Sequence, residues 1–416
     1  MSKIRTLSVG LVCVMALSSH LLGSTGQVGT CLSGVTKLGS SIQNAVNALP
    51  PNSTLFVCPG TYQEQVKVTQ PITITGVKDP HSTADAAVIA APSGGIVANT
   101  TSLATGNPIA AQLVMDTPGG PVHVNNMTID GSNNQISGCA PELVGVFYRD
   151  ASGSINQVNA INQALSTALN GCQSGLGIFV QSGTPLTSTV TVKNSYVANY
   201  QKNGITGNEV GTTLTSLSNT VFGQGPTMGA AENGIQFGFG ATGSANSNTV
   251  MDNVYSPGSA AAAGILVFAS ANVTVKSNTV GNAQLGISFD SDPTYGLADS
   301  GTIVSNKVLA THLFDGIDLC SNNNTVQSNS IIGSDESAIH LDAACGSTGN
   351  SNIVTNNEIN DSCAGILKDP GTTGNGVGSN VFHNVTNTVA TGPICTNPPK
   401  GRHSGKVGLT PQPVRP

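Results

Sequence analysis

The protein has 416 residues, of which 9% are charged and 4% aromatic, and its formal net charge is −6. Because it has no basic stripe and no interleaved aromatic side chains, this composition excludes an ordinary nucleic-acid-binding protein. After residue 26 no stretch approaches the roughly 20 apolar residues that a membrane-spanning helix needs, so no transmembrane segment is expected once the leader is removed.

Residues 1–26 are predicted to be a signal peptide. Lys3 and Arg5 precede an apolar run from Leu7 to Leu22, and small residues follow this run. A charged start, an apolar stretch and small residues are typical of a secretory signal. The sequence therefore predicts a secreted or periplasmic protein that is cleaved at about Gln27.

Most of the chain repeats a phrase in which a small residue and an aliphatic residue open a short alternating strand. The steps between successive phrases are 22 to 32 residues long. The shortest step is roughly one coil of three short strands at about 3.3 Å per residue, with three turns. A repeat of this length without intervening helices is typical of a solenoid. The phrases start at Gly145, Gly177, Gly204, Gly234, Gly264, Gly286, Gly316, Ala338 and Gly365.

A second marker, asparagine at the turns, advances along the chain together with the first. Within each strand apolar residues alternate with polar ones, and this period of two puts one set inward and the other outward. Inward aliphatic side chains would stack about 4.8 Å apart, and the asparagines could form a ladder that bonds backbone groups. The marker occurs at Asn125, Asn159, Asn219, Asn253, Asn278, Asn306, Asn329, Asn357 and Asn384, with Ser195 in the gap.

The two ends of the repeat differ from its middle. Residues 77–121 are less regular and are expected to form the first wide coils with loops. Residues 391–416 are rich in proline and basic residues and are predicted to be a flexible tail. Residues 27–390 are then one all-β solenoid domain, since repeats grow in one dimension. A monomer is the expected state.

The repeat and the N-terminal stretch that precedes it resemble the right-handed parallel β-helix proteins of the pectin-lyase-like superfamily. In that stretch, residues 41–51 are similar to the helix that caps the first coil, and Thr54–Tyr62 and Ile72–Gly76 are similar to the first strands. The resemblance covers roughly residues 38–390. It implies an all-β, right-handed, single-stranded parallel β-helix with a short N-terminal capping helix.

This superfamily includes pectin methylesterase-like proteins, bacterial polysaccharide lyases and epimerases, and periplasmic β-helix proteins that assist copper enzymes. The resemblance implies a fold and not a reaction, because one scaffold hosts many sites. Its catalytic motifs are incomplete in this sequence. Thr294 stands where the histidine of the Asp-Pro-His motif of alginate epimerases would be, and no Arg-Ile-Lys of polygalacturonases occurs.

Acidic residues gather at the outward positions of the later coils. If the register holds, four coils place Asp290, Asp318, His340, Asp342 and Asp369 on one face, with Asp315, Asp335 and Glu336 on its rim. Carboxylates at this spacing repel one another, which raises the pKa of at least one of them or recruits a cation. A carboxyl of raised pKa could protonate a glycosidic oxygen, with His340 as base or orienting group.

Asp318 is the central candidate of this acidic face. The predicted catalytic residues are Asp318, His340, Asp315, Asp290 and Asp342. Asp290, Asp318 and Asp342 could instead bind Ca²⁺, the one cofactor that the sequence suggests. The histidines of the solenoid stand singly, which argues against a copper cluster. They are His81, His123, His312, His340 and His383.

Three functions remain open from the sequence. The first is an exported protein that binds or acts on an extracellular polysaccharide, such as a uronic-acid polymer, through the acidic face. If it is an enzyme, it is a polysaccharide lyase, a glycoside hydrolase or an epimerase. The second is a non-catalytic β-helix of the cell envelope. The third is an accessory protein of a periplasmic metalloenzyme.

Eight cysteines follow the leader, and an even number in an exported chain indicates disulfide bonds. Sequential pairing gives separations of 27, 33, 25 and 32 residues, each close to one coil. Strands of neighbouring coils lie about 5 Å apart, which is within the Cα distance that a disulfide needs. The predicted pairs are Cys31–Cys58, Cys139–Cys172, Cys320–Cys345 and Cys363–Cys395.

Overall fold

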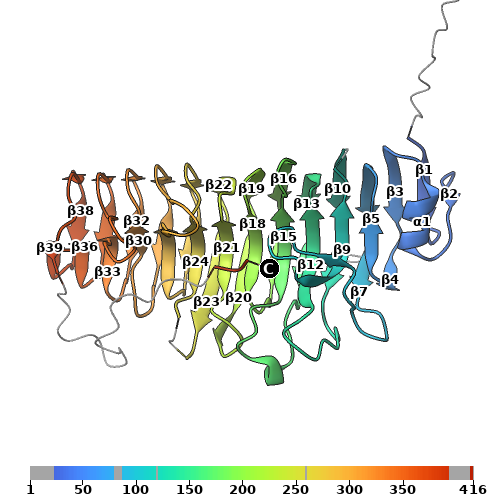
Figure 1. The fold of residues 1–416 in the computed structure, drawn as a ribbon, viewed down its shortest axis with the longest axis horizontal. Coiled ribbons are helices and arrows are strands. Elements are labelled where there is room, and N and C mark those ends of the chain that lie inside the picture. The colour runs from blue at the N-terminus through green and yellow to red at the C-terminus, as the bar shows by residue number, and fades with distance from the viewer. Residues whose placement is uncertain (1–22, 79–86, 119, 258–259, 393–412, 416) are drawn as a thin grey trace, which may run out of the picture.

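The computed structural model describes residues 23–78, 87–118, 120–257, 260–392 and 413–415 as a solenoid of short strands (Figure 1). Three sheets run along its length, with 14, 12 and 13 strands. Neighbouring strands in each sheet are parallel, except that β8 (Thr100–Thr101) pairs antiparallel with β9. The right-handed parallel β-helix predicted from the sequence is thus confirmed.

The 14-stranded sheet holds one strand of almost every coil. In spatial order its strands are β2 (Thr36–Lys37), β1 (Thr25–Val28), β3 (Ser53–Val57), β6 (Ile72–Gly76), β10 (Pro121–Asn125), β13 (Ser152–Asn156), β16 (Ser188–Lys193), β19 (Thr212–Leu217), β22 (Thr242–Asn246), β25 (Thr274–Lys276), β28 (Thr302–Val304), β31 (Thr325–Gln327), β34 (Ile353–Thr355) and β37 (Gly376–Gly378).

The 12-stranded sheet follows it in each coil. Its strands are β4 (Gly60–Gln63), β7 (Ala87–Ala90), β11 (Thr128–Asp130), β14 (Asn159–Ile161), β17 (Tyr196–Ala198), β20 (Thr220–Thr227), β23 (Thr249–Tyr255), β26 (Thr279–Gly281), β29 (Lys307–Leu309), β32 (Ser330–Ile332), β35 (Glu358–Asn360) and β38 (Val381–His383).

The 13-stranded sheet carries the candidate site on its outward face. Besides β8, its strands are β5 (Val66–Val68), β9 (Pro108–Asp116), β12 (Glu142–Arg149), β15 (Leu176–Gln181), β18 (Asn203–Asn208), β21 (Asn233–Gly238), β24 (Ala263–Phe268), β27 (Leu285–Asp290), β30 (Ile317–Cys320), β33 (Ser337–Leu341), β36 (Ala364–Lys368) and β39 (Asn387–Thr391). A 3-10 helix, η1 (Thr167–Leu169), lies in the loop before β15.

Aliphatic side chains of the same type stack in the interior of the coil, as the alternation predicts. One column of the 13-stranded sheet consists of paired isoleucines, all fully buried, and each contributes roughly 1.5–3 kcal/mol relative to an exposed side chain. The column runs through Ile178, Ile205, Ile235, Ile265, Ile287, Ile317, Ile339 and Ile366.

The small residue that opens each phrase is explained by the distance between coils. A Cβ added to Gly234 would lie 2.6 Å from the carbonyl oxygen of Gly264, and one added to Gly286 would lie 2.3 Å from that of Gly316. Carbon and oxygen atoms do not approach so closely without displacement. Asn233, directly before Gly234, and Gln236, two residues after it, both bond the side chain of Asn203 in the preceding coil.

The asparagine ladder is confirmed from Ser195 onward, with two changes of register, but Asn125 and Asn159 were wrongly assigned to it, because they lie inside β10 and at the start of β14 and bond Thr75 and Thr128. Each asparagine side-chain oxygen accepts the backbone N–H of the equivalent residue one coil earlier, at 2.9–3.0 Å. Asn248 and Asn380 occupy the places predicted for Asn253 and Asn384, because they stand directly before their strands while Asn253 lies inside β23. The ladder runs through Ser195, Asn219, Asn248, Asn278, Asn306, Asn329, Asn357 and Asn380.

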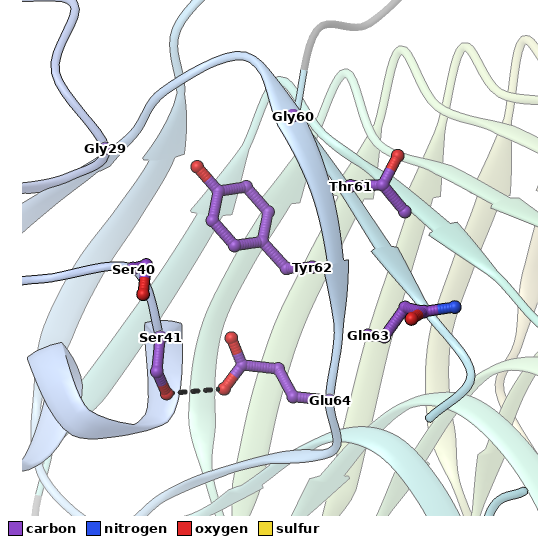
Figure 2. A pocket seen from close by; sticks show the side chains of 8 residues that line it. All are labelled: Gly29, Ser40, Ser41, Gly60, Thr61, Tyr62, Gln63 and Glu64. Carbon is purple, nitrogen blue, oxygen red and sulfur yellow. Dashed lines mark hydrogen bonds between the residues drawn. The ribbon is translucent and has the colours of Figure 1, made fainter. Parts of the chain in front are cut away.

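The predicted capping helix is α1 (Ile42–Ala48), which buries Ile42, Ala45 and Val46 at the N-terminal end of the solenoid. Ser41 caps it, and Glu64 accepts hydrogen bonds from the Ser41 hydroxyl and from two N–H groups of the first turn at 2.7–3.1 Å. Figure 2 shows the shallow pocket between Tyr62 and Glu64 beside this turn. Because Glu64 is engaged by the helix, the pocket is part of the cap.

The predicted leader lies mostly outside the described residues, but its predicted boundary falls inside β1. The Gln27 side chain is buried, accepts the N–H groups of Cys31 and Leu32, and donates to the carbonyls of Leu32 and Val35. Cleavage at Gln27 would remove this anchor and most of the strand that pairs with β3.

We therefore expect the exported chain to begin at or before Thr25. Intact-mass measurement and N-terminal sequencing of the exported protein test this expectation. A mature N-terminus at Gln27 or later would contradict it.

Among the described residues, no helix is long and apolar enough to cross a membrane.

Three of the predicted disulfides are present. Cys31–Cys58, Cys139–Cys172 and Cys320–Cys345 each join neighbouring coils, with Cα atoms 5.1–5.6 Å apart. Cys363 is also disulfide-bonded. Its predicted partner, Cys395, lies outside the described residues, so the fourth pair stays a prediction.

Candidate functional site

The candidate site is the outward face of β27, β30, β33 and β36. The strand register places Ser288 beside Asp318 and Asp318 beside His340, as the repeat predicts. Asp290 lies at the end of β27, one coil before Asp318. Asp342 and Asp369 follow the ends of β33 and β36. Residues that lie more than 75 positions apart in the sequence, such as Asp290 and Asp369, thus share one surface.

His340 is the centre of the hydrogen bonds at this site. Its Nδ1 lies 3.2 Å from Asp315 Oδ2 and its Nε2 lies 3.2 Å from Asp369 Oδ1. Burial by itself lowers the pKa of His340, but the charge and hydrogen bond of Asp315, with the contribution of Asp369, outweigh burial. The pKa of His340 is therefore well above its usual value, and the imidazole is positively charged at neutral pH.

Asp315 is not on the rim, where the sequence placed it. It is 3% exposed, and its Oδ1 accepts hydrogen bonds from the N–H and the hydroxyl of Ser337. Asp315 stands just before Gly316 and β30, and its Oδ2 lies beside Nδ1 of His340 in the next coil. Asp315 thereby orients and charges the imidazole.

Asp318 and Asp290 are also buried carboxyl groups of the site, 7% and 1% exposed. The Ser288 hydroxyl lies 2.7 Å from Asp290 Oδ1 and 3.4 Å from Asp318 Oδ2. It has one proton, so it can donate to only one of them at a time. Asp318 Oδ1 and Asp290 Oδ2 are buried without a hydrogen-bond partner among the described residues. The nearest cation to Asp318 Oδ1 is His340 Nδ1 at 3.9 Å.

Burial raises the pKa of both carboxyl groups, and neighbouring carboxylates add to this effect. The pKa of Asp290 is raised to about 7. The pKa of Asp318 is raised well above its usual value, first by burial and then by Asp342 and Asp290. These effects favour the protonated form of Asp318, and its Oδ1 faces the His340 imidazole.

Asp342 and Asp369 form the open edge of the site. The Asp369 side chain is 26% exposed, and its hydrogen bond to His340 is the largest cause that lowers its pKa to about 2. Burial raises the pKa of Asp342 to about 6. Asp369 thus stays ionised at neutral pH, whereas burial favours the protonated form of Asp318.

Two groups of ligand atoms are close enough to hold a cation. They are Asp315, Asp318 and His340, and His340, Asp342 and Asp369, with the atoms of each group within 4.8 Å of one another. The predicted calcium trio of Asp290, Asp318 and Asp342 matches neither group, because Asp290 lies in neither. Asp335 and Glu336 also lie in neither group, and Asp335 accepts the N–H of Leu313 instead.

The sequence did not single out several polar residues that the structure brings into play. Ser288 and Ser337 bond the site carboxylates, and their outward position in the repeat was the available signal. A second buried group of charges joins Glu142, at the start of β12, with Lys202 and Glu232, which directly precede β18 and β21. Burial raises the pKa of Glu142 to about 8 and lowers that of Lys202 to about 7. The Lys202 ammonium donates to the carbonyl of Ala231, so this group holds loops in place.

A family model described as "Periplasmic copper-binding protein (NosD)" matches residues 185–397, just over half of the chain. The chain belongs to the NosD family. As the sequence predicts, this NosD-family protein is secreted or periplasmic. By sequence, none of the curated proteins matches it.

Three solved structures are similar to the NosD-family chain. The GH136 lacto-N-biosidase from Eubacterium ramulus is 11% identical, with a TM-score of 0.50, over 86% of this chain and 68% of that one. The DFA-IIIase from Arthrobacter chlorophenolicus A6 is 12% identical, with a TM-score of 0.46, over 83% and 82%. The periplasmic alginate epimerase AlgG is 11% identical, with a TM-score of 0.43, over 84% and 82%. At this identity the similarity to the lacto-N-biosidase concerns the fold alone.

Proposed function

We propose that this NosD-family protein binds an extracellular polysaccharide on the outward face of its 13-stranded sheet and transfers a proton to it at Asp318. The observation that supports this proposal is the state of Asp318. Its carboxyl is buried, its pKa is raised well above the usual value, and its Oδ1 has no hydrogen-bond partner among the described residues. A positioned acid of this kind can protonate a leaving oxygen.

The neighbours of Asp318 supply the other parts of an acid–base site. Once Asp318 has given up its proton, the imidazolium of His340 at 3.9 Å stabilises the carboxylate that forms. Asp369 stays ionised, so it is the candidate base or nucleophile. Two carboxyl groups whose surroundings drive their pKa values apart are typical of acid and base partners in glycoside cleavage.

The proposed ligand is a polymer of uronic acids. A fully ionised acidic face would repel such a polymer. Burial favours the protonated forms of Asp290 and Asp318, and the raised pKa of His340 favours its charged form, so the face is less negative than its sequence indicates. A Ca²⁺ ion in either group of ligand atoms would further favour an acidic sugar.

The family description names copper, and thiolate and thioether ligands select copper(I). In the described part of the chain, the two groups of possible ligand atoms contain only carboxylates and one imidazole. Cys320 is disulfide-bonded and offers no thiolate. These donors do not fit copper(I), and oxygen ligands of this kind suit Ca²⁺ or Mn²⁺ better. The proposed function therefore has no step through copper(I).

We expect the intact protein to bind pectate, alginate or another uronic-acid polymer in a screen with Ca²⁺ and with a chelator. Ultraviolet absorbance of an unsaturated product identifies a lyase, new reducing ends identify a hydrolase, and binding without either identifies a non-catalytic protein. Neutral polysaccharides are the control. If the protein binds no uronic-acid polymer in either condition, the proposed function is wrong.

A further inference from the structure

The last described residues of the chain, 413–415, lie across the outward face of the 13-stranded sheet, near β18 and β21 (Figure 1). Gln236 Oε1 accepts the Val414 N–H at 3.0 Å, and Gln236 Nε2 donates to the Val414 carbonyl at 3.0 Å. Asn208 Nδ2 donates to the same carbonyl at 2.7 Å. The buried side chain of Gln236 thus bonds both the N–H and the carbonyl of Val414, without any strand pairing.

The two side chains of the docked segment also have their own contacts. Val414 is 2% exposed and packs in an apolar cluster with Phe147 and Phe179, whose rings stack with centroids 4.7 Å apart. The Arg415 guanidinium makes two hydrogen bonds to the carboxylate of Glu209, at 2.8 and 2.9 Å. It lies 4.8 Å from the centroid of the Phe239 ring and 5.3 Å from that of Tyr295. Bidentate pairing and ring stacking are the contacts that distinguish arginine from lysine.

The surface beneath the segment is shaped for a peptide backbone. Gln236 and Asn208 are fully buried beneath the segment, and Gln236 Nε2 also donates to Asn208 Oδ1 at 2.9 Å, which fixes the two amides side by side. At the position equivalent to Gln236, β15 carries Phe179 and β24 carries Leu266, which are apolar. Gly238 leaves room for the amides: a Cβ there would lie 2.6 Å from Asn208 Oδ1 and 3.0 Å from Gln236 Nε2.

The segment itself suits such a surface. Arg415 stands between Val414 and Pro416, and Pro413 precedes Val414. Proline fixes its own backbone, and the residue before a proline is restricted to extended conformations. A Pro-Val-Arg-Pro segment therefore loses little conformational freedom when it binds, as proline-rich ligands generally do. This docking was not expected from the prediction that residues 391–416 form a flexible tail.

We propose that Gln236, Asn208, Glu209, Phe239 and Tyr295 form a peptide-binding site for an extended Val-Arg segment, and that the chain's own C-terminus is its resident ligand. The amides recognise the backbone, the apolar cluster takes the valine, and Glu209 with the two rings takes the arginine. The proposal does not depend on the acidic site, because none of these residues belongs to it.

Hydrogen exchange at Val414 tests the resident ligand. Between Pro411 and Pro416 only Gln412, Val414 and Arg415 have a backbone N–H, so a peptic fragment of this stretch reports on Val414 and at most two other amides. We expect its exchange to be slowed at least tenfold in the intact protein. Gln236→Leu and Gly238→Ala should remove this protection, and Gln173→Leu, which changes an exposed glutamine, should keep it. Unprotected Val414 in the intact protein would overturn the proposal.

A synthetic peptide of residues 408–416 tests the site in trans. The full-length double variant Val414→Gly/Arg415→Ala, whose own tail is weakened, should bind the labelled peptide at least tenfold more tightly than the native protein does. Adding Glu209→Gln should reverse most of this gain. No binding by the double variant at millimolar peptide, the effective concentration of a tethered segment, would overturn the proposal. Protection of Val414 that grows with protein concentration, together with a dimer, would instead assign the site to a second copy and overturn the resident ligand.

Discussion

Asp318→Asn is expected to lower polymer turnover by at least 100-fold, or to abolish polymer binding if the protein is not an enzyme, while the fold stays as stable at pH 7. Asparagine keeps the size of the side chain but has no acidic proton. General acid catalysis by a positioned side chain contributes about 10² to 10⁴ in rate. Because the folded protein holds Asp318 in its neutral form, the neutral amide costs little at this position. Turnover, polymer binding and the urea midpoint of both proteins measure these effects.

Asp361→Asn is the matched control, since it changes an exposed aspartate in the turn before β36. It should leave binding and turnover unchanged. The assignment of Asp318 would be refuted by an Asn variant that keeps full binding and turnover. A variant that loses activity only because it unfolds would be recognised by its lower urea midpoint.

The free energy of unfolding is expected to fall as the pH rises from about 5 to 8, and Asp290→Asn should remove part of this slope. Burial raises the pKa of Asp290 to about 7, whereas the unfolded chain releases this proton near the usual value of 3.8. A raised pKa gives stability that is complete below about pH 4 and is lost as the pH passes through about 7. The raised pKa values of Asp342 and Glu142, about 6 and 8, act in the same direction.

The expected size of the Asp290 effect follows from its pKa. A shift of about three units corresponds to roughly 4 kcal/mol as an upper bound. Asp290→Asn should therefore be more stable than the native protein by roughly 1–4 kcal/mol at pH 8, and about equal to it at pH 4. Asparagine can still accept the hydrogen bond of Ser288. Urea unfolding at several pH values provides the measurement, and an unchanged pH slope in the variant would contradict this account of Asp290.

The sequence by itself determined the coil, its two faces and three disulfide bonds. Strands of period two must alternate inward and outward, so Ile287, Ile317 and Ile339 stack inside while Asp318 and His340 meet outside. Cysteines one coil apart are close enough to bond, as Cys320 and Cys345 are. Each of these features depends on distances that the repeat length fixes, and the repeat is visible in one dimension.

Only the tertiary structure decided how deeply each polar residue is buried and which neighbour it contacts. Periodicity placed Asp315 on a rim, but the folded chain buries it beside His340 and makes it an ion-pair partner. Periodicity likewise assigned Asn253 to the asparagine ladder, whereas Asn248 occupies that place, because insertions move the turn within a coil. Gln236 bonds Val414 across 178 residues. No periodic pattern joins these two residues, because that contact depends on the folded surface and on the return of the C-terminus to it.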